Sequence, residues 1–171
     1  GEGAQVAAPA VPALEADYET VLDRAALQRW VERLAASELI AVDTETTSLD
    51  YMAARVVGVS VSAEPGVAAY IPFGHDYLGA PEQLGEAEVL AALRPLLEAK
   101  QPRKIGQNLK YDLSVLANHG IALDGIAFDT MLESYVLDSV GSRHDMDALA
   151  LRHLDYRTIK FEDVAGKGAR Q

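Results

Sequence analysis

The chain has 171 residues, a length that suits a single domain. It contains no cysteine, which excludes a disulfide scaffold, a cysteine-ligated zinc site and a thiol nucleophile, and which fits a reducing compartment. The formal net charge of −11 argues against nucleic-acid binding, unless bound divalent cations reverse the charge locally. No apolar run is long enough to span a bilayer, so we expect a cytoplasmic protein without membrane contact.

The N-terminal residues differ in composition from the rest of the chain. Residues 1–14 are rich in Ala, Pro and Gly, which predicts a linker or a remnant of cloning and leaves 15–171 as the domain. Asp23 is placed to cap a helix that reaches about Ser37. The apolar residues of this segment recur at helical spacing, and they include Trp30, which we expect in the core.

Three strands are predicted next. Residues 39–42 form a short, partly β-branched apolar run, which predicts a buried strand that ends at Asp43. The segments 55–62 and 67–71 are rich in Val and Ile. A turn at 64–66 separates them, so the sequence predicts a hairpin.

The second half of the chain favours helices. They are predicted over 85–99, 108–118, 129–138 and 145–153, with a short strand over 104–106 and a loop over 158–171. Strands joined by hairpin links and followed by alternating strands and helices predict an α/β fold. We therefore expect a mixed central sheet flanked by helices.

Two carboxylates stand at the expected end of the first buried strand. Alternation puts Asp43 and Glu45 on one face, where their charges repel each other unless a divalent cation lies between them. Ligands of α/β sheets usually bind at such a strand end. The alternative is a polar junction in which Asp43 and Thr44 cap a turn, and an isolated Asp-x-Glu favours this alternative.

Asn108 and Asp112 stand four residues apart at the start of a predicted helix, so they share one of its faces. Taken alone, Asn108 is explained as an N-cap, and Asp112 as a first-turn acid that the helix dipole favours. Asp129 is most simply the N-cap of the next helix.

These patterns occur together in an order typical of a known family. The segments 42–46 (VDTET) and 107–112 (QNLKYD) resemble the first and second motifs of the DEDD exonucleases, which have a ribonuclease-H-like fold. The resemblance extends to the 3′→5′ proofreading exonuclease domains of bacterial DNA polymerase I, of polymerase family A, and it covers nearly the whole chain after the linker. The segments that carry it are 67–72, 128–135, 143–147 and 166–168.

The resemblance implies a metal-dependent hydrolase. Its cofactors would be two divalent metal ions, Mg²⁺ or alternatively Mn²⁺ or Zn²⁺, with Asp43 bridging both. Glu45 would bind one ion, and Asp112 would hold the other through water. The implied reaction is hydrolysis of the 3′-terminal phosphodiester of single-stranded or frayed DNA, which releases nucleoside 5′-monophosphates.

The resemblance also implies DNA contacts at five positions. Leu49 would wedge against the terminal bases, and Phe161 would be its aromatic partner. Asn108, Tyr111 and Arg143 would lie near the substrate backbone. Ordinary packing is the alternative for Leu49 and Phe161, and a solvated loop charge is the alternative for Arg143.

One family motif, a Tyr-x-x-x-Asp that supplies the fourth carboxylate, does not occur before Gln171. We therefore expect the C-terminal part of the domain to be missing and the isolated chain, a monomer, to have little activity. The expected partners are a single-stranded DNA 3′ end and the polymerase domain of the same polypeptide. The alternative function is an inactive fragment or a vestigial exonuclease fold that serves as a structural module of the polymerase. A free-standing nuclease acting on RNA is the least favoured reading.

Overall fold

A computed structural model describes residues 16–140 and 143–159 of the protein. Its centre is a six-stranded sheet with the strand order β1-β4-β3-β2-β5-β6. The strands are β1 (Asp17–Thr20), β2 (Leu39–Thr46), β3 (Val56–Glu64), β4 (Val67–Pro72), β5 (Arg103–Gly106) and β6 (Ile126–Asp129). β3 runs antiparallel to both β2 and β4, whereas the other three neighbouring pairs are parallel, so the predicted mixed sheet is confirmed.

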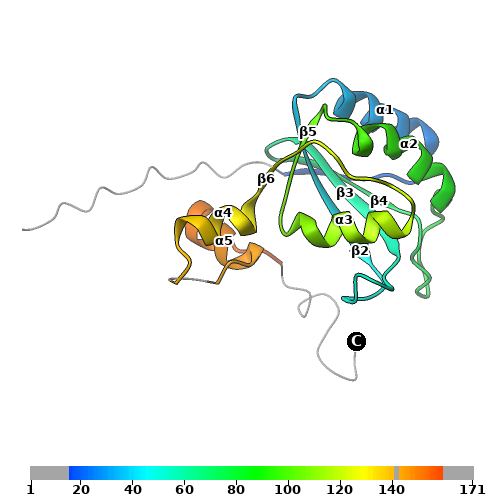
Figure 1. Ribbon diagram of the computed structural model, residues 1–171. Coiled ribbons are helices and arrows are strands. Elements are labelled where there is room, and N and C mark those ends of the chain that lie inside the picture. Colours follow the sequence, from blue (N-terminus) through cyan, green and yellow to red (C-terminus); the bar gives the residue numbers. More distant parts are fainter. Residues whose placement is uncertain (1–15, 141–142, 160–171) are drawn as a thin grey trace, which may run out of the picture.

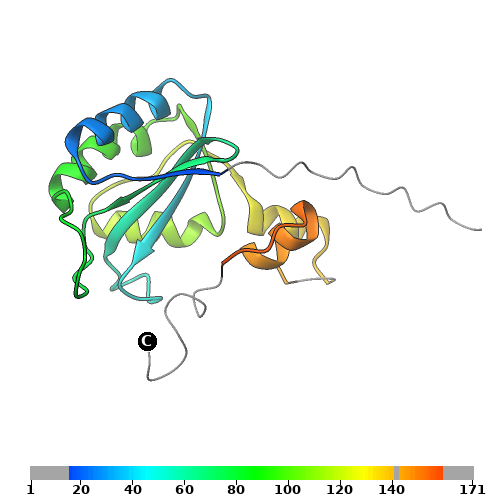
Figure 2. The ribbon, with the colours of Figure 1, turned by 180° about the vertical axis from the view of Figure 1, so that it is seen from behind.

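Helices cover one face of this sheet (Figures 1 and 2). The five helices of the described residues are α1 (Arg24–Ala35), α2 (Glu86–Glu98), α3 (Leu109–Asn118), α4 (Thr130–Leu137) and α5 (Met146–Leu154). α1, α2 and α3 lie in front of the strands in Figure 1, while α4 and α5 lie to one side, beyond β6. None of the five is long and apolar enough to cross a membrane.

The face under α1, α2 and α3, here called the covered face, is aliphatic. In β2, Ile40 and Val42 point into it, and Val42 lies opposite Val61 of β3. Val59 and Ile71 continue this layer on β3 and β4, and both are fully buried. Trp30 of α1 is 4% exposed, as predicted, and it completes the core from the helix side.

The opposite face, here called the open face, carries small and polar side chains. Because side chains alternate along a strand, the residues between the core positions all point to it. Its members on β2, β3 and β4 are Ala41, Asp43, Glu45, Ser60, Ser62, Ala68 and Tyr70. In Figure 2 the strands lie in front of α3, so this face is turned toward the viewer.

Most predicted elements are confirmed within two residues of their ends, but one boundary is wrong. β2 does not end at Asp43. It continues through Thr46, because Asp43 pairs with Ser60 and Glu45 with Gly58 of β3. The carboxylates therefore lie within a strand rather than after one.

β1 and β6 were not predicted. Each is a four-residue edge strand, with three exposed residues in β1 and two in β6, so neither shows the apolar alternation that marks a strand in a sequence. The predicted linker at 1–14 and the predicted loop after 159 lie outside the described residues.

Candidate active site

Asp43 and Glu45 share the open face near the end of β2, as predicted. Asp43 is half-buried and Glu45 is exposed. A hollow of about 310 Å³ lies beside Asp43, and one of about 560 Å³ lies beside Glu45. Ser60 of β3 borders both hollows. The two carboxylates therefore face solvent-accessible space on the same side of the sheet.

Thr44, between these two carboxylates, points to the covered face and holds the third one. Its hydroxyl donates to Oδ1 of Asp112 at 2.7 Å, and its backbone N–H donates to the same oxygen at 2.9 Å. Asp112 lies in the first turn of α3 and is only 2% exposed. The Asp-Thr-Glu segment thus contributes two carboxylates to one face and fixes a helix-borne carboxylate on the other.

The three carboxylates interact electrostatically. Burial, Asp112 and Glu45, in that order, raise the pKa of Asp43 to about 6. The pKa of Asp112 is also raised, mainly by burial and further by Asp129, although the hydrogen bonds from Thr44 act in the opposite direction. Because repulsion between like charges is part of both shifts, the cluster carries negative charge that its own neighbours do not compensate.

The metal assignment remains a prediction. Across residues 16–140 and 143–159, no group of three or more His, Cys, Asp or Glu side chains has an arrangement that could hold a metal ion. Both hydrogen bonds from Thr44 engage Oδ1 of Asp112. Asp112 also raises the pKa of Asp43, so these two carboxylates lie within electrostatic reach of each other.

The start of α3 is capped by a side chain from another element. Asn108 occupies the N-cap position in the left-handed region, with φ 63° and ψ 44°, and its side chain makes no capping hydrogen bond. Asp129 supplies the cap from the end of β6. Its carboxylate accepts the backbone N–H of Asn108 at 3.1 Å and that of Leu109 at 2.8 Å. Asn108 is therefore the N-cap of α3 by position, as the alternative explanation held, while the capping side chain is that of Asp129.

Asp129 is a structural residue whose second role the sequence did not reveal. Its Oδ1 also accepts the backbone N–H groups of Met131 and Leu132, which caps α4 as predicted. One buried carboxylate thus satisfies the first turns of two helices. A short sequence motif cannot show this, because α3 begins about twenty residues earlier in the chain.

Gly106 lets α3 approach β2 closely. A Cβ at this position would lie 2.8 Å from the carbonyl oxygen of Val42 and 2.5 Å from the side chain of Leu109. Any larger residue would push the first turn of α3, with Asp112, away from the strand. The glycine before Gln107-Asn108 is therefore required by packing.

The five predicted DNA-contact positions have different surroundings. Leu49 is 92% exposed, on the loop after β2. Tyr111 is half-buried, and its hydroxyl contacts Oγ1 of Thr46 and the carbonyl oxygen of Ser48, each at 2.5 Å. Arg143 is an exposed loop residue that forms an ion pair of 2.8 Å with Asp145.

Asn108 adjoins the first turn of α3, and Phe161 lies outside the described residues. Tyr111 and Asn108 therefore flank Asp112 on α3, whereas Arg143 lies in the separate segment before α5. None of these positions is tested as a DNA contact by the geometry, and all five remain predictions.

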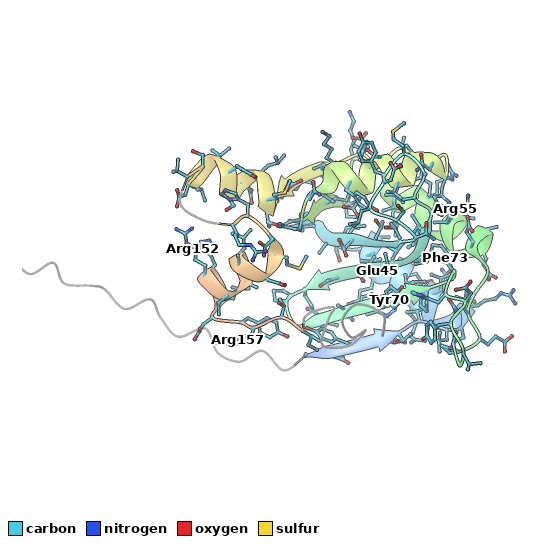
Figure 3. All side chains as sticks on the ribbon, turned by 90° about the horizontal axis from the view of Figure 1, so that it is seen from below. Glu45, Arg55, Tyr70, Phe73, Arg152 and Arg157 are labelled. Carbon is cyan, nitrogen blue, oxygen red and sulfur yellow. The ribbon has the colours of Figure 1, made fainter. Side chains whose placement is uncertain are left out.

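Sequence reasoning also missed a set of aromatic side chains, here called the aromatic wall, which borders the hollow beside Glu45 and consists of Tyr70, His75 and Tyr77. Glu45 and Tyr70 are labelled in Figure 3. The hydroxyl of Tyr70 is hydrogen-bonded to Nε2 of His75, and the ring of Tyr77 lies edge-on to His75 at 5.9 Å. A Cβ on Gly58 would lie 2.1 Å from the Tyr70 oxygen, so this glycine makes room for the ring. Burial, Glu45 and Tyr77 raise the pKa of Tyr70 to about 12. The sequence signal was a glycine inside a Val-rich strand.

Comparison with known proteins agrees with this geometry. A family model described as a 3′-5′ exonuclease matches residues 18–171. DNA polymerase I of Pseudomonas aeruginosa is 58% identical over 159 residues, which are 92% of this chain and 17% of that protein. The chain thus spans about a sixth of the length of this relative.

Solved structures show the same fold at low sequence identity. RNase D of Trypanosoma brucei matches with a TM-score of 0.66 and 18% identity, over 86% of this chain and 50% of that one. NrnC of Brucella melitensis with bound Mg²⁺ matches with a TM-score of 0.58 and 21% identity, over 90% and 68%. The predicted ribonuclease-H-like fold is confirmed, and the chain belongs to the 3′-5′ exonuclease family, in the form found in bacterial DNA polymerase I.

Proposed function

We propose that this chain is the proofreading exonuclease domain of a polymerase and that it removes nucleotides from single-stranded or frayed DNA 3′ ends with divalent metal ions. One observation carries the proposal. The fold brings Asp43 and Glu45 of β2 within electrostatic reach of Asp112, which is 67 or more residues away in the chain. Asp43 and Glu45 each border a hollow on the open face, and the buried Asp112 raises the pKa of Asp43 from the other side of β2.

The donor set suits a hard divalent cation. Mg²⁺ and Mn²⁺ prefer carboxylate oxygens, and no cysteine or histidine takes part in the cluster that would favour Zn²⁺. A bound cation would offset the repulsion that contributes to the raised pKa of Asp43. Asp43 and Glu45 would hold the ions directly, whereas Asp112, bonded to Thr44, would act through water.

The protein groups have separate roles in this proposal. Divalent cations would supply the positive charge that attracts the phosphodiester and makes a water molecule acidic enough to attack it. Thr44 holds Asp112 in the first turn of α3, and Asp129 caps that same turn. The open face next to Asp43 would admit the phosphodiester, and the exposed Leu49 would meet the terminal bases.

The proposal also includes parts of the intact protein beyond the described residues, namely a fourth carboxylate and a polymerase domain. Residues 15–171 would belong to the exonuclease domain, and a Tyr-x-x-x-Asp segment of the intact protein would complete the set of carboxylates. The isolated chain would be a monomer with little activity. In the intact cytoplasmic protein, a polymerase domain of the same polypeptide would deliver the DNA.

The test is the doubly substituted protein Asp43→Asn with Glu45→Gln, made in the intact protein. With Mg²⁺ and a 3′-labelled single-stranded oligonucleotide, we expect the exonuclease rate to fall on the order of 10³-fold, because the main cation ligands are gone. Asp17→Asn on β1, at the far edge of the sheet, is the matched control and should retain the parental rate. A double variant that digests 3′ ends at the parental rate contradicts the proposal.

A second measurement separates catalysis from a structural role. Calorimetric titration of the intact protein with Mn²⁺ should show binding that the double variant lacks, and we expect the isolated chain to bind the metal poorly. If neither the chain nor the intact protein binds Mn²⁺ at millimolar concentration, the fold serves as a structural module of the polymerase. Equal or faster cleavage of RNA by the intact protein would contradict the DNA-editing role.

A further inference from the structure

We propose that Asn118, at the end of α3, is a positioning residue that holds the loop of residues 47–55 in place for the terminal bases of the DNA. This inference rests on the proposed function, because it concerns how the loop that carries Leu49 meets its substrate. Neither the sequence motifs nor the metal cluster involve Asn118. Its role follows from the hydrogen bonds it makes.

The loop of residues 47–55 is closed at its base and exposed at its tip. The backbone N–H of Thr47 donates to the carbonyl oxygen of Arg55 at 3.0 Å, and the N–H of Arg55 donates to Oγ1 of Thr47 at 3.1 Å. At the tip, the side chains of Leu49 and Met52 are 92% and 74% exposed. Because these apolar groups contact little of the core, side-chain packing does not hold the tip.

Asn118 forms hydrogen bonds with the middle and the end of this loop. Its Nδ2 donates to the carbonyl oxygen of Tyr51 at 2.8 Å and to that of Ala54 at 3.0 Å. One amide therefore fixes two backbone groups of the loop to the last turn of α3. The side chain of Ala54 is buried at 1% exposure, whereas Leu49 and Met52 at the tip are largely exposed, so removing the amide should loosen the tip more than the base of the loop.

Two further contacts attach the ends of the loop to the same helix. At its start, the hydroxyl of Tyr111 contacts the carbonyl oxygen of Ser48 at 2.5 Å. Just after its end, Nε2 of His119 accepts the backbone N–H of Val56 at 3.0 Å, while Nδ1 faces Glu86 at 3.1 Å. The loop is thus bound along α3 from the first turn of the helix to the residue after its last turn.

This arrangement relates Leu49 to the carboxylate cluster through one rigid element. α3 carries Asp112 in its first turn and Asn118 at its end, so the helix sets the distance between the tip of the loop and the acids. A loop already held in its working position loses less conformational entropy when DNA binds. Loss of Asn118 should therefore weaken substrate binding and leave the chemical step unchanged.

The experiment compares Asn118→Ala with Ser114→Ala in the intact protein. Ser114 lies on the same helix, and its hydroxyl bonds only the carbonyl oxygen of Lys110, so its loss should change neither kcat nor KM. For Asn118→Ala we expect KM for a single-stranded oligonucleotide to rise about tenfold at an unchanged kcat, as the loss of two hydrogen bonds implies. An unchanged KM, or a kcat that falls as much as kcat/KM, overturns the proposal.

A double-mutant cycle with Leu49→Ala shows whether Asn118 acts through the loop. If it does, Asn118→Ala should have little further effect on KM once Leu49 is removed. If both substitutions together raise KM by the product of the single effects, Asn118 acts independently of Leu49 and the proposal is wrong.

Hydrogen exchange distinguishes this proposal from the proposed function. In Asn118→Ala, and not in Ser114→Ala, the amides of residues 47–55 should exchange faster, whether or not the protein cleaves DNA. Faster exchange in an inactive protein would support the loop anchor and contradict the exonuclease role. Unchanged exchange would contradict the anchor, whatever the activity.

Discussion

The two faces of the central sheet are made from the same strands but differ in what they demand of their residues. The covered face alternates Ile and Val under three helices, and its side chains are almost fully buried. The open face alternates Ala, Ser and acids beside two hollows. Residues on the covered face must pack closely, whereas residues on the open face carry charge and remain accessible to solvent.

The difference teaches that neighbouring residues on one strand can be under unrelated constraints. Val42 and Asp43 are adjacent, yet the first supports the core and the second carries a pKa raised to about 6. A substitution of a buried aliphatic residue should therefore lower stability through a cavity, whereas a substitution of an open-face acid should act through its charge. The predictions below test this separation.

The largest effect on stability is expected on the covered face. Ile71 of β4 is fully buried, so Ile71→Ala removes buried methylene groups and leaves a cavity. We expect the free energy of unfolding to fall by about 3 to 4 kcal/mol. Ser60→Ala, on the open face of the neighbouring strand, should change it by about 0.5 kcal/mol or less. Urea unfolding measures both, and similar losses in the two variants would remove the distinction between the faces.

A smaller effect is expected from the charge on the open face of the metal-free protein. Asp43 binds its proton more tightly when folded, since its pKa is raised from 3.8 to about 6. Between these values the folded state holds more protons at Asp43 than the unfolded state, so the contribution of Asp43 to stability is fully present below pH 4 and is lost as the pH rises through 6. The shift corresponds to about 2 to 3 kcal/mol.

Urea unfolding in a chelating buffer from pH 4 to pH 7 measures this loss. Asp43→Asn should reduce the dependence on pH, because the substituted side chain does not titrate. Asp112 should keep part of it, since its pKa is raised as well. An identical pH dependence of stability in the two proteins would show that the pKa of Asp43 is not raised in the folded protein.

The smallest of these effects is expected at Asp129, where β6 meets both α3 and α4. Asp129→Ala removes the carboxylate that accepts four backbone N–H groups from two helices, and it should cost about 2 kcal/mol. Asp145→Ala is the matched control, because Asp145 caps α5 alone through Ala148, and it should cost about 1 kcal/mol. Equal losses in the two variants would mean that the second helix gains nothing from Asp129.

Local patterns were enough to predict the elements that build the covered face. The β-branched runs of β3 and β4 and the helical spacing around Trp30 depend on burial, which leaves a periodic trace in the sequence. The extension of β2 past Asp43 could not be seen in this way. It depends on the pairing of Asp43 with Ser60 and of Glu45 with Gly58. Polar residues allow such pairing, but they leave no apolar pattern in the sequence that would predict it.

The candidate site was predicted through resemblance more than through spacing. Asp43, Glu45 and Asp112 fitted ordinary caps and turns until the motifs were considered together. The bond from Thr44 to Asp112 and the double cap at Asp129 join residues far apart in the chain, so no window of sequence contains them. The wall formed by Tyr70 and His75 was missed for the same reason, since Gly58 on another strand makes room for it.

The hydrogen bond between Thr44 and Asp112 also has a consequence for how the molecule folds. It joins residues 68 positions apart, whereas the β2–β3 and β3–β4 pairs close much shorter loops. Contacts between residues far apart in the sequence form slowly, because closing the long loop between them costs conformational entropy before the contact contributes any stabilising energy. The meander of β2, β3 and β4 can therefore assemble while Asp43 is still far from Asp112. Asp43 approaches Asp112 only when α3 docks on β2, so a long-range contact rather than the local pairing of the meander brings their charges together.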